Sequence, residues 1–122
     1  MHPEGPAPLT GPDAVNDADS TAINTPVEVD VLGNDDGGTG YLVPSTVRVT
    51  VDPAHGTATV DPATGKITYT PSENFWGEDV LTYEVCNDNL PQLCDTATVT
   101  ITIPQPAAPE ATDDADSRSE ER

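Results

Sequence analysis

The clearest alternation of hydrophobic and polar side chains runs along two segments in the second half of the chain. Over residues 79–86, aspartate, leucine, tyrosine and valine at odd positions alternate with valine, threonine, glutamate and cysteine at even positions. Over residues 96–103, alanine, valine and isoleucine alternate with threonine. A period of two places successive side chains on opposite faces of a strand, so both segments are predicted to be half-buried β-strands.

Shorter segments of the same kind occupy the first half of the chain. They are residues 15–20, 27–31, 46–51, 57–60 and 66–70. In the third of these, Val47, Val49 and Val51 are expected to point inward. Gly65 directly precedes the last and suits the positive φ of a hairpin turn. Because no helical periodicity appears, we predict an all-β antiparallel sandwich of about seven strands.

The two cysteines fix a register for the last two strands. If Cys86 faces Cys94 across an antiparallel hairpin, Tyr83 lies opposite Ala97, a large residue against a small one on the inner face. The same register places threonines opposite each other on the outer face, so we predict a Cys86–Cys94 disulfide. The loop-entropy relation gives such a short bridge about 2.5 kcal/mol. A disulfide indicates an oxidising compartment, so we expect the protein to be extracellular, secreted or on the cell surface.

Charge narrows the range of partners. The chain has 122 residues, with 22 acidic and 4 basic ones, and a formal net charge of −18. Such a surface repels nucleic acid, which is therefore excluded as a partner. No apolar run approaches the ~20 residues of a membrane span, so no membrane insertion is expected. The acidic chain either repels itself, belongs to a high-salt or solvating context, or neutralises its carboxylates with cations such as calcium.

The ends of the chain suggest a repeat. Residues 1–12 are predicted to be an unstructured linker or expression overhang, residues 13–104 a single domain, and residues 105–122 a Pro-rich linker followed by the start of a further unit. The sequence PDAVNDADS at residues 12–20 returns as PEATDDADS at residues 109–117, with six of nine positions identical at an offset of 97 residues. Because no secretory signal precedes the domain, we expect a piece of a longer exported protein.

Four motifs together resemble a known family. They are VLGND at residues 31–35, HGTATV at 55–60, YTPSENFWGEDVLTYEV at 69–85 and TATVTITI at 96–103. This series is similar to the bacterial Ig-like or cadherin-like tandem repeats of large cell-surface or secreted adhesins. The resemblance implies an extracellular Ig-like sandwich, a spacer or adhesive role, stabilisation by calcium, and adjacent repeats of the same chain as partners. The isolated domain is expected to be monomeric.

Tyr83 also resembles the conserved tyrosine of immunoglobulin-type domains, whose hydroxyl bonds back to the backbone. We therefore expect a structural role for it. Phe75 and Trp76 lead into a core strand, so Trp76 is expected to close the base of the sandwich, although an exposed sugar-stacking platform is the alternative. His55 lies in a turn without nearby metal-binding partners and is interpreted as a turn residue.

Clustered carboxylates in loops are the candidate calcium ligands, because this ion prefers oxygen donors. Tracing the strands up and down the sandwich brings Asp17, Asp35 and Asp88 to the end where the chain enters. Asp79 and Asp114 come to the exit end, where the site is completed only by the next unit. The alternative is that all these carboxylates are simply solvated.

The leading functional hypothesis is a non-catalytic structural or adhesive repeat of an exported bacterial surface protein, stabilised by calcium. The alternative is an accessory module of a secreted enzyme that binds a carbohydrate or a cell-surface protein. No set of side chains in the sequence has the composition of a catalytic site, so an enzyme is not expected.

Overall fold

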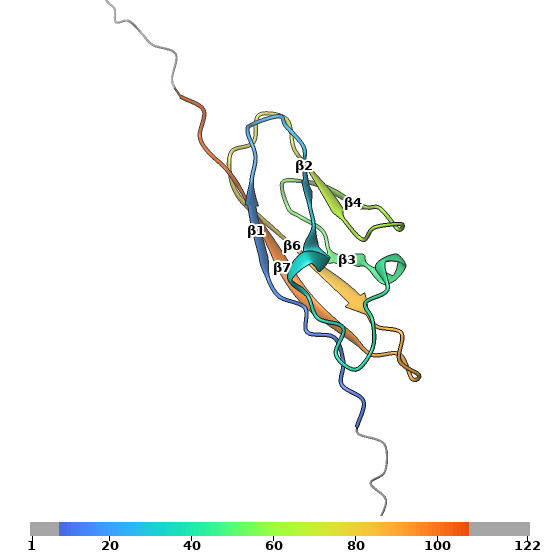
Figure 1. The fold of residues 1–122 in the computed structure, drawn as a ribbon. Helices are drawn as coiled ribbons and strands as arrows, with labels where there is room; N and C mark the ends of the chain where they lie inside the picture. The colour runs from blue at the N-terminus through green and yellow to red at the C-terminus, as the bar shows by residue number, and fades with distance from the viewer. Residues whose placement is uncertain (1–7, 108–122) are drawn as a thin grey trace, which may run out of the picture.

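Seven β-strands in two facing sheets make up the computed structural model, which describes residues 8–107 (Figure 1). The strands are β1 Asp17–Ser20, β2 Val27–Val29, β3 Arg48–Val51, β4 Gly56–Val60, β5 Ile67–Pro71, β6 Gly77–Cys86 and β7 Cys94–Ile103. Two short 3-10 helices, η1 Val31–Asn34 and η2 Pro44–Thr46, are the helical segments in this part of the chain. The predicted all-β sandwich is confirmed.

One sheet has the order β1-β7-β6-β3 and the other the order β2-β5-β4. All neighbouring strands are antiparallel except β1 and β7, which run parallel from Asp17 opposite Val99 to Ser20 opposite Thr102. The expected wholly antiparallel arrangement is therefore wrong for this one pair. Because the first and last strands run in the same direction, the chain enters at one end of the sandwich and leaves at the other (Figure 1).

The predicted register of the long hairpin is confirmed. Cys86 lies opposite Cys94, and Tyr83 lies opposite Ala97. The odd positions of both strands face the other sheet and form most of the core. The buried hydrophobic cluster comprises Val29, Val31, Val47, Ile67, Tyr69, Leu81, Tyr83, Val85, Ala97, Val99, Ile101 and Ile103. The period-two pattern thus predicted both the pairing and the buried face of β6 and β7.

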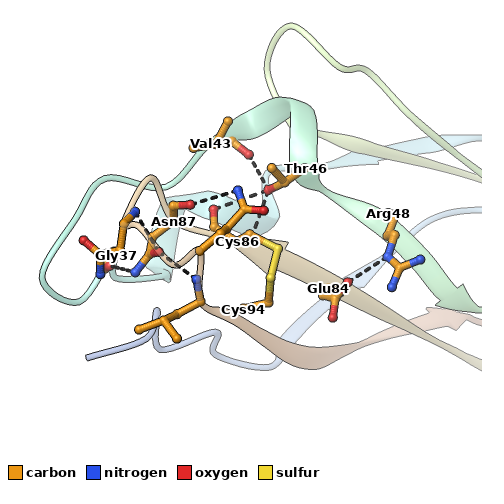
Figure 2. Close-up of a disulfide and its surroundings, with 11 residues drawn as sticks. Gly37, Val43, Thr46, Arg48, Glu84, Cys86, Asn87 and Cys94 are labelled. Atoms are coloured by element: carbon orange, nitrogen blue, oxygen red, sulfur yellow. Dashed lines mark hydrogen bonds and ion pairs between the residues drawn. A yellow bond between two sulfur atoms is a disulfide. The ribbon is translucent and has the colours of Figure 1, made fainter. Parts of the chain in front are cut away.

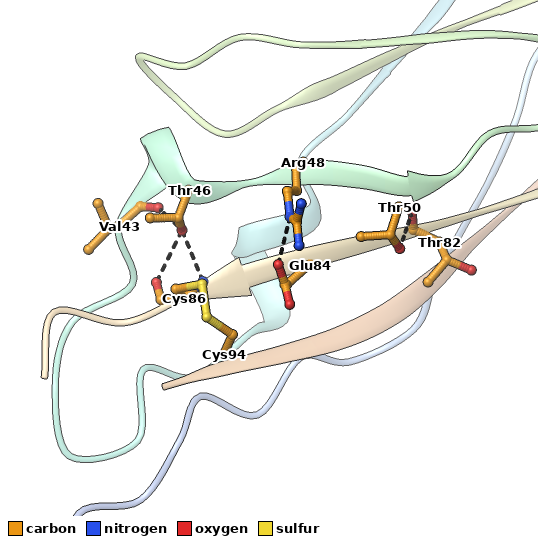
Figure 3. Close-up of polar contacts among 8 residues, drawn as sticks. All are labelled: Val43, Thr46, Arg48, Thr50, Thr82, Glu84, Cys86 and Cys94. Carbon is orange, nitrogen blue, oxygen red and sulfur yellow. Dashed lines mark hydrogen bonds and ion pairs between the residues drawn. A yellow bond between two sulfur atoms is a disulfide. The ribbon is translucent and has the colours of Figure 1, made fainter. Parts of the chain in front are cut away.

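The alternation predicted for β3 holds at Val47 and Val49 but is wrong at Val51, which is exposed. The register shifts after Val49, so that Val51 instead of Thr50 lies opposite Thr82. This β-bulge reverses the faces beyond it, because one extra residue in a strand shifts the two-residue period. Figure 3 shows Thr50 and Thr82 beside each other on these strands.

Strand β2 ends earlier than predicted because the chain turns at LGND. Val31 is buried as expected, but it begins η1, in which Gly33 donates a backbone hydrogen bond to Asp30. The β4–β5 hairpin follows the prediction, and Gly65 has a φ of 77°. A side chain there would also collide with Leu32, whose Cδ1 lies 2.7 Å from the place of a Cβ atom. Glycine is therefore required at this turn by both conformation and space.

Candidate functional site

Loops from distant parts of the sequence meet at the two ends of the sandwich. We call the end where the chain enters the entry pole, formed by residues 8–13, 36–42 and 87–93. The opposite end, formed by residues 21–25, 72–78 and 103–107, is the exit pole. At the exit pole the side chain of Asn24 accepts a hydrogen bond from the backbone N–H of Asn74 at 2.7 Å and donates one to its side chain. These two bonds connect two loops of the exit pole.

Asn87 organises the entry pole and was not singled out from the sequence. Its side chain is fully buried and donates hydrogen bonds to the carbonyls of Gly37 and Thr10, at 3.0 and 3.3 Å. Its Oδ1 accepts the backbone N–H groups of Asn89 and Leu93, both at 3.2 Å. Figure 2 shows Asn87 reaching across to Gly37. A buried amide that satisfies its donors and its acceptor fixes three loops at once, and local sequence patterns carry no information about such distant partners.

The predicted disulfide between Cys86 and Cys94 is confirmed and closes the loop next to Asn87 (Figure 2). The two bridged residues differ in exposure, because Cys86 is buried and Cys94 is exposed. The difference arises because Thr46 of η2 crosses over Cys86 and accepts its backbone N–H at 2.9 Å (Figure 3). The sulfurs lie close to Glu84, but a disulfide offers no thiolate to a metal ion.

Two of the predicted calcium ligands, Asp17 and Asp35, converge on the hydroxyl of Tyr83. The distances from this oxygen are 2.6 Å to Asp35 and 3.4 Å to Asp17. The carbonyls of Val15 and Val31 lie 3.3 and 3.4 Å away. A phenol has one proton, so the shortest contact identifies Asp35 as the acceptor. Tyr83 thus bonds mainly to a carboxylate, with backbone carbonyls nearby, and this contact joins β6 to the segment that follows β2.

The proximity of these groups changes their proton affinities. Burial, followed by the negative charge of Asp35, raises the pKa of Asp17 to about 6. Burial also raises the pKa of Asp35, although its hydrogen bond from Tyr83 acts in the opposite direction. The pKa of the Tyr83 hydroxyl is raised by burial and by its bond to Asp35, so it remains a donor. Ionising Asp17 and Asp35 at neutral pH is therefore unfavourable, because both carboxylates are partly buried and the charge of Asp35 repels that of Asp17.

The donors around Tyr83 fit a hard cation, because they are carboxylate and carbonyl oxygens. Asp35 also accepts the backbone N–H of Val15 at 2.8 Å, which occupies one of its oxygens. Asp88 lies apart from the pair and accepts the backbone N–H of Tyr41 at 2.8 Å. Within residues 8–107, no group of three carboxylates has its oxygens within 4.8 Å of one another. Of the predicted calcium ligands, Asp17 and Asp35 are thus the two that the fold brings together.

Asp79, predicted at the exit-end site, is buried and fully engaged within the domain. Its oxygens accept the backbone N–H groups of Ala54 and His55 at 3.0 and 2.9 Å, and the hydroxyl of Tyr69 at 2.7 Å. These bonds hold the turn before β4 against β5 and β6, which is a structural task. Asp114, the other predicted ligand at this end, lies outside the described residues.

Trp76 was expected to close the base of the sandwich, but in the structure Phe75 has this position. Phe75 packs against the core and stacks on the ring of His55, with centroids 4.4 Å apart. Trp76 has 49% of its surface exposed at the exit pole. Phe75 therefore covers this end of the core, and His55 is a turn residue that stacks on it.

Two sheets pack face to face around one apolar core, and the chain passes from one sheet to the other several times. This arrangement defines an immunoglobulin-like β-sandwich. The bacterial Ig domain family matches residues 7–102. The chain therefore belongs to the bacterial Ig domain family, as its motifs suggested. Domains of this family are in general non-catalytic structural modules. Such domains and intramolecular disulfides are typical of extracellular proteins.

A solved structure from Saccharophagus degradans, described as a nucleoside hydrolase-related hypothetical protein associated with carbohydrate metabolism, has a similar fold. The TM-score is 0.50 at 11% identity, and the match covers 79% of this chain and 26% of the other. This chain thus spans a minor part of that protein, and the likeness shows the fold alone. No curated protein matches the chain. Among the described residues, no helix is sufficiently long and apolar to span a bilayer.

Proposed function

We propose that this domain is a structural repeat of an exported bacterial surface protein and adds length to a string of Ig-like units. The parallel pairing of β1 with β7 carries the proposal, because it separates the entry and exit of the chain by the whole length of the sandwich. The recurrence of PDAVNDADS as PEATDDADS, just beyond the domain, supports a following unit. Units of this kind stack end to end and contact only their neighbours.

Calcium binding between Asp17 and Asp35, next to the entry pole, is the second part of the proposal. Asp17 and Asp35 would hold the ion, with the nearby carbonyls of Val15 and Val31 as further oxygen donors. A bound divalent ion would neutralise the two carboxylates that the fold places together. Asp88 contributes to a second position beside Tyr41 only if an ion draws it away from that backbone bond.

Small-angle X-ray scattering tests the spacer role. Two copies of the chain, joined so that residue 109 of the first is replaced by residue 12 of the second, should reach about twice the maximum dimension of one unit. The single chain is the control. A tandem protein that folds back into a side-by-side pair would overturn the proposal.

The exposed Trp76 favours one alternative, an accessory module that binds a glycan or a cell-surface protein. An exposed indole ring offers a flat apolar face on which a sugar ring can stack. Titration with soluble oligosaccharides, followed by the fluorescence of this single tryptophan, separates the two functions. A saturable change in fluorescence, together with a heat of binding in calorimetric titration that Trp76→Ala abolishes, would support the binding module. No change in fluorescence and no heat of binding would support the spacer function.

A further inference from the structure

The 97-residue offset assigns a position to the residues that follow β7. It aligns residues 105–108, Gln-Pro-Ala-Ala, with residues 8–11, Pro-Leu-Thr-Gly. In this domain that segment belongs to the entry pole. The backbone N–H of Thr10 donates to Thr39 at 3.1 Å, and the carbonyl of Thr10 accepts from Asn87 at 3.3 Å. Most of the apparent linker therefore corresponds to an ordered part of the next unit.

The aligned residues fit these positions. Both bonds of Thr10 use its backbone, so alanine at position 107 retains them. A Cβ atom at Gly11 would lie 3.5 Å from the Cβ of Leu93, which is ordinary van der Waals contact, so this position tolerates an alanine. In a unit built like this one, the segment anchored at Ala107 begins only four residues after Ile103, which is buried at the end of β7.

This spacing brings the poles of successive units close together. The three intervening residues, 104–106, include two prolines, which favour an extended backbone. Four steps along such a chain span at most about 13 Å. Large side chains on the two facing poles can bridge that distance, so the units cannot tumble independently.

Exposed apolar side chains lie on both poles. Trp76 at the exit pole directly precedes Gly77, which pairs with Ile103. At the entry pole, Tyr41 and Leu90 have 81% and 90% of their surfaces exposed. Tyr41 is held in place because its backbone exchanges two bonds with Asp88, at 2.8 and 3.0 Å. Tryptophan and tyrosine are enriched at protein–protein interfaces relative to the rest of the surface.

We propose, resting on the repeat function above, that the exit pole of each unit packs directly on the entry pole of the next, with Trp76 of one unit against Tyr41 and Leu90 of its successor. Charge opposes this contact, since Glu73 and Glu78 are exposed at the exit pole and Asp36 and Asp88 at the entry pole. The contact therefore strengthens with added salt, because ions screen repulsion between exposed carboxylates.

Acrylamide quenching of tryptophan in the tandem protein tests the contact. The tandem has residues 1–108 of the first copy followed by residues 12–122 of the second, and Trp76→Phe in the second copy leaves one reporting indole. We expect quenching of Trp76 to fall below that of the single chain, and to fall further with added sodium chloride. Insertion of roughly six glycine and serine residues after Pro104 is the matched control and should restore the quenching of the single chain.

A second variant tests the entry pole of the second copy, which the proposal places against Trp76. Tyr41→Ser with Leu90→Ser in the second copy should also restore quenching, because both side chains are exposed and their loss does not disturb the core. Equal quenching in the single chain, the tandem and the spacer control would overturn the direct contact. If quenching is equal but scattering still shows an extended tandem, the spacer function stands without a direct contact between the units. A folded-back particle would instead overturn the spacer function itself.

Discussion

The hydroxyl of Tyr69 donates a hydrogen bond of 2.7 Å to the buried carboxylate of Asp79. Tyr69 is a core residue of β5, whereas Asp79 lies in β6 of the other sheet. The bond therefore joins the two sheets through the interior of the sandwich. Asp79 also caps the turn before β4 through two backbone N–H groups.

Replacement of Asp79 by alanine should lower the free energy of unfolding by at least about 3 kcal/mol, because it leaves two backbone donors and a phenol without their charged acceptor. Urea denaturation followed by circular dichroism measures the loss. Glu78→Ala, which removes an exposed neighbouring carboxylate, should change stability by less than about 0.5 kcal/mol. Similar effects of both changes would contradict the role assigned to Asp79.

Tyr83→Phe should cost about 1.5 to 3 kcal/mol, because it removes the hydrogen bond to the charged carboxylate of Asp35 and leaves the ring in place. Leu81→Ala, which empties a core position, should cost about 2 to 5 kcal/mol through the cavity it leaves. The matched control is Tyr41→Phe at an exposed position, with an expected effect below about 0.5 kcal/mol. If Tyr83→Phe were as mild as this control, the contact with Asp35 would contribute nothing.

Acidification from neutral pH should stabilise the domain. The pKa of Asp17 is about 6 in the folded state, against an ordinary value of 3.8. Between these values the folded state binds more protons than the unfolded state, so stability falls as pH rises through this range. Denaturant unfolding should therefore give a higher midpoint at about pH 5 than at about pH 7.

Asp17→Asn isolates the contribution of this one group from the general relief of repulsion on the acidic surface. The variant should be more stable than the natural chain at neutral pH, and the two should converge at low pH. A midpoint that rises from about pH 5 to about pH 7 in the natural chain, or a variant without effect on the pH dependence, would contradict the placement of Asp17 beside Asp35.

Replacing both Cys86 and Cys94 by alanine should lower stability by about 2.5 kcal/mol while the sandwich remains folded. The domain should survive because the core lies on the opposite face of β6 and β7, and because Asn87 independently holds the loop between them. Thermal unfolding and near-ultraviolet circular dichroism measure the two effects. Complete unfolding of the variant would show that the bridge, and not the core, maintains the fold.

Calcium should raise the melting temperature more than sodium chloride at matched ionic strength, because an ion bound between Asp17 and Asp35 removes a repulsion that the folded state maintains. At about 100 times the dissociation constant, linkage gives roughly 2.7 kcal/mol. Asp35→Asn should abolish the difference between the two salts, whereas Asp36→Asn on the neighbouring exposed residue should preserve it. Identical melting temperatures in both salts would contradict a calcium site, because general screening of the acidic surface would then explain the whole stabilisation.

Local periodicity correctly predicted the strands along which buried and exposed side chains alternate without interruption. The faces of β6 and β7 and the pairing of Cys86 with Cys94 follow directly from a two-residue period. Val51 departed from its predicted face because a bulge inserts one residue, and the sequence of β3 carries no mark of that insertion. The parallel partner of β1 was missed for a related reason, since strand direction depends on the path of the whole chain.

The candidate site was predictable only as far as the up-and-down path of the strands shows which loops share one end of the sandwich. Loop tracing brought Asp17 and Asp35 to one end correctly, and the structure joins them through Tyr83. Counting carboxylates could not distinguish Asp79, which is buried among backbone donors, from an exposed ligand. Asn87 escaped notice because its partners lie up to 77 positions away in the sequence.

The parallel alignment of β1 with β7 also determines how the domain bears tension. Force applied through the two ends pulls β1 and β7 in opposite directions along their common axis. The hydrogen bonds between them are then loaded together in shear, instead of being opened one after another as in a hairpin pulled apart from its end. The Cys86–Cys94 bridge joins β6 to the first residue of β7 and does not cross the paired residues 17–20 and 99–102, so the load falls first on the backbone bonds between β1 and β7 and on the anchoring of residues 8–13 at the entry pole. A domain of this topology pulled from its two ends would thus resist stretching at its two terminal strands.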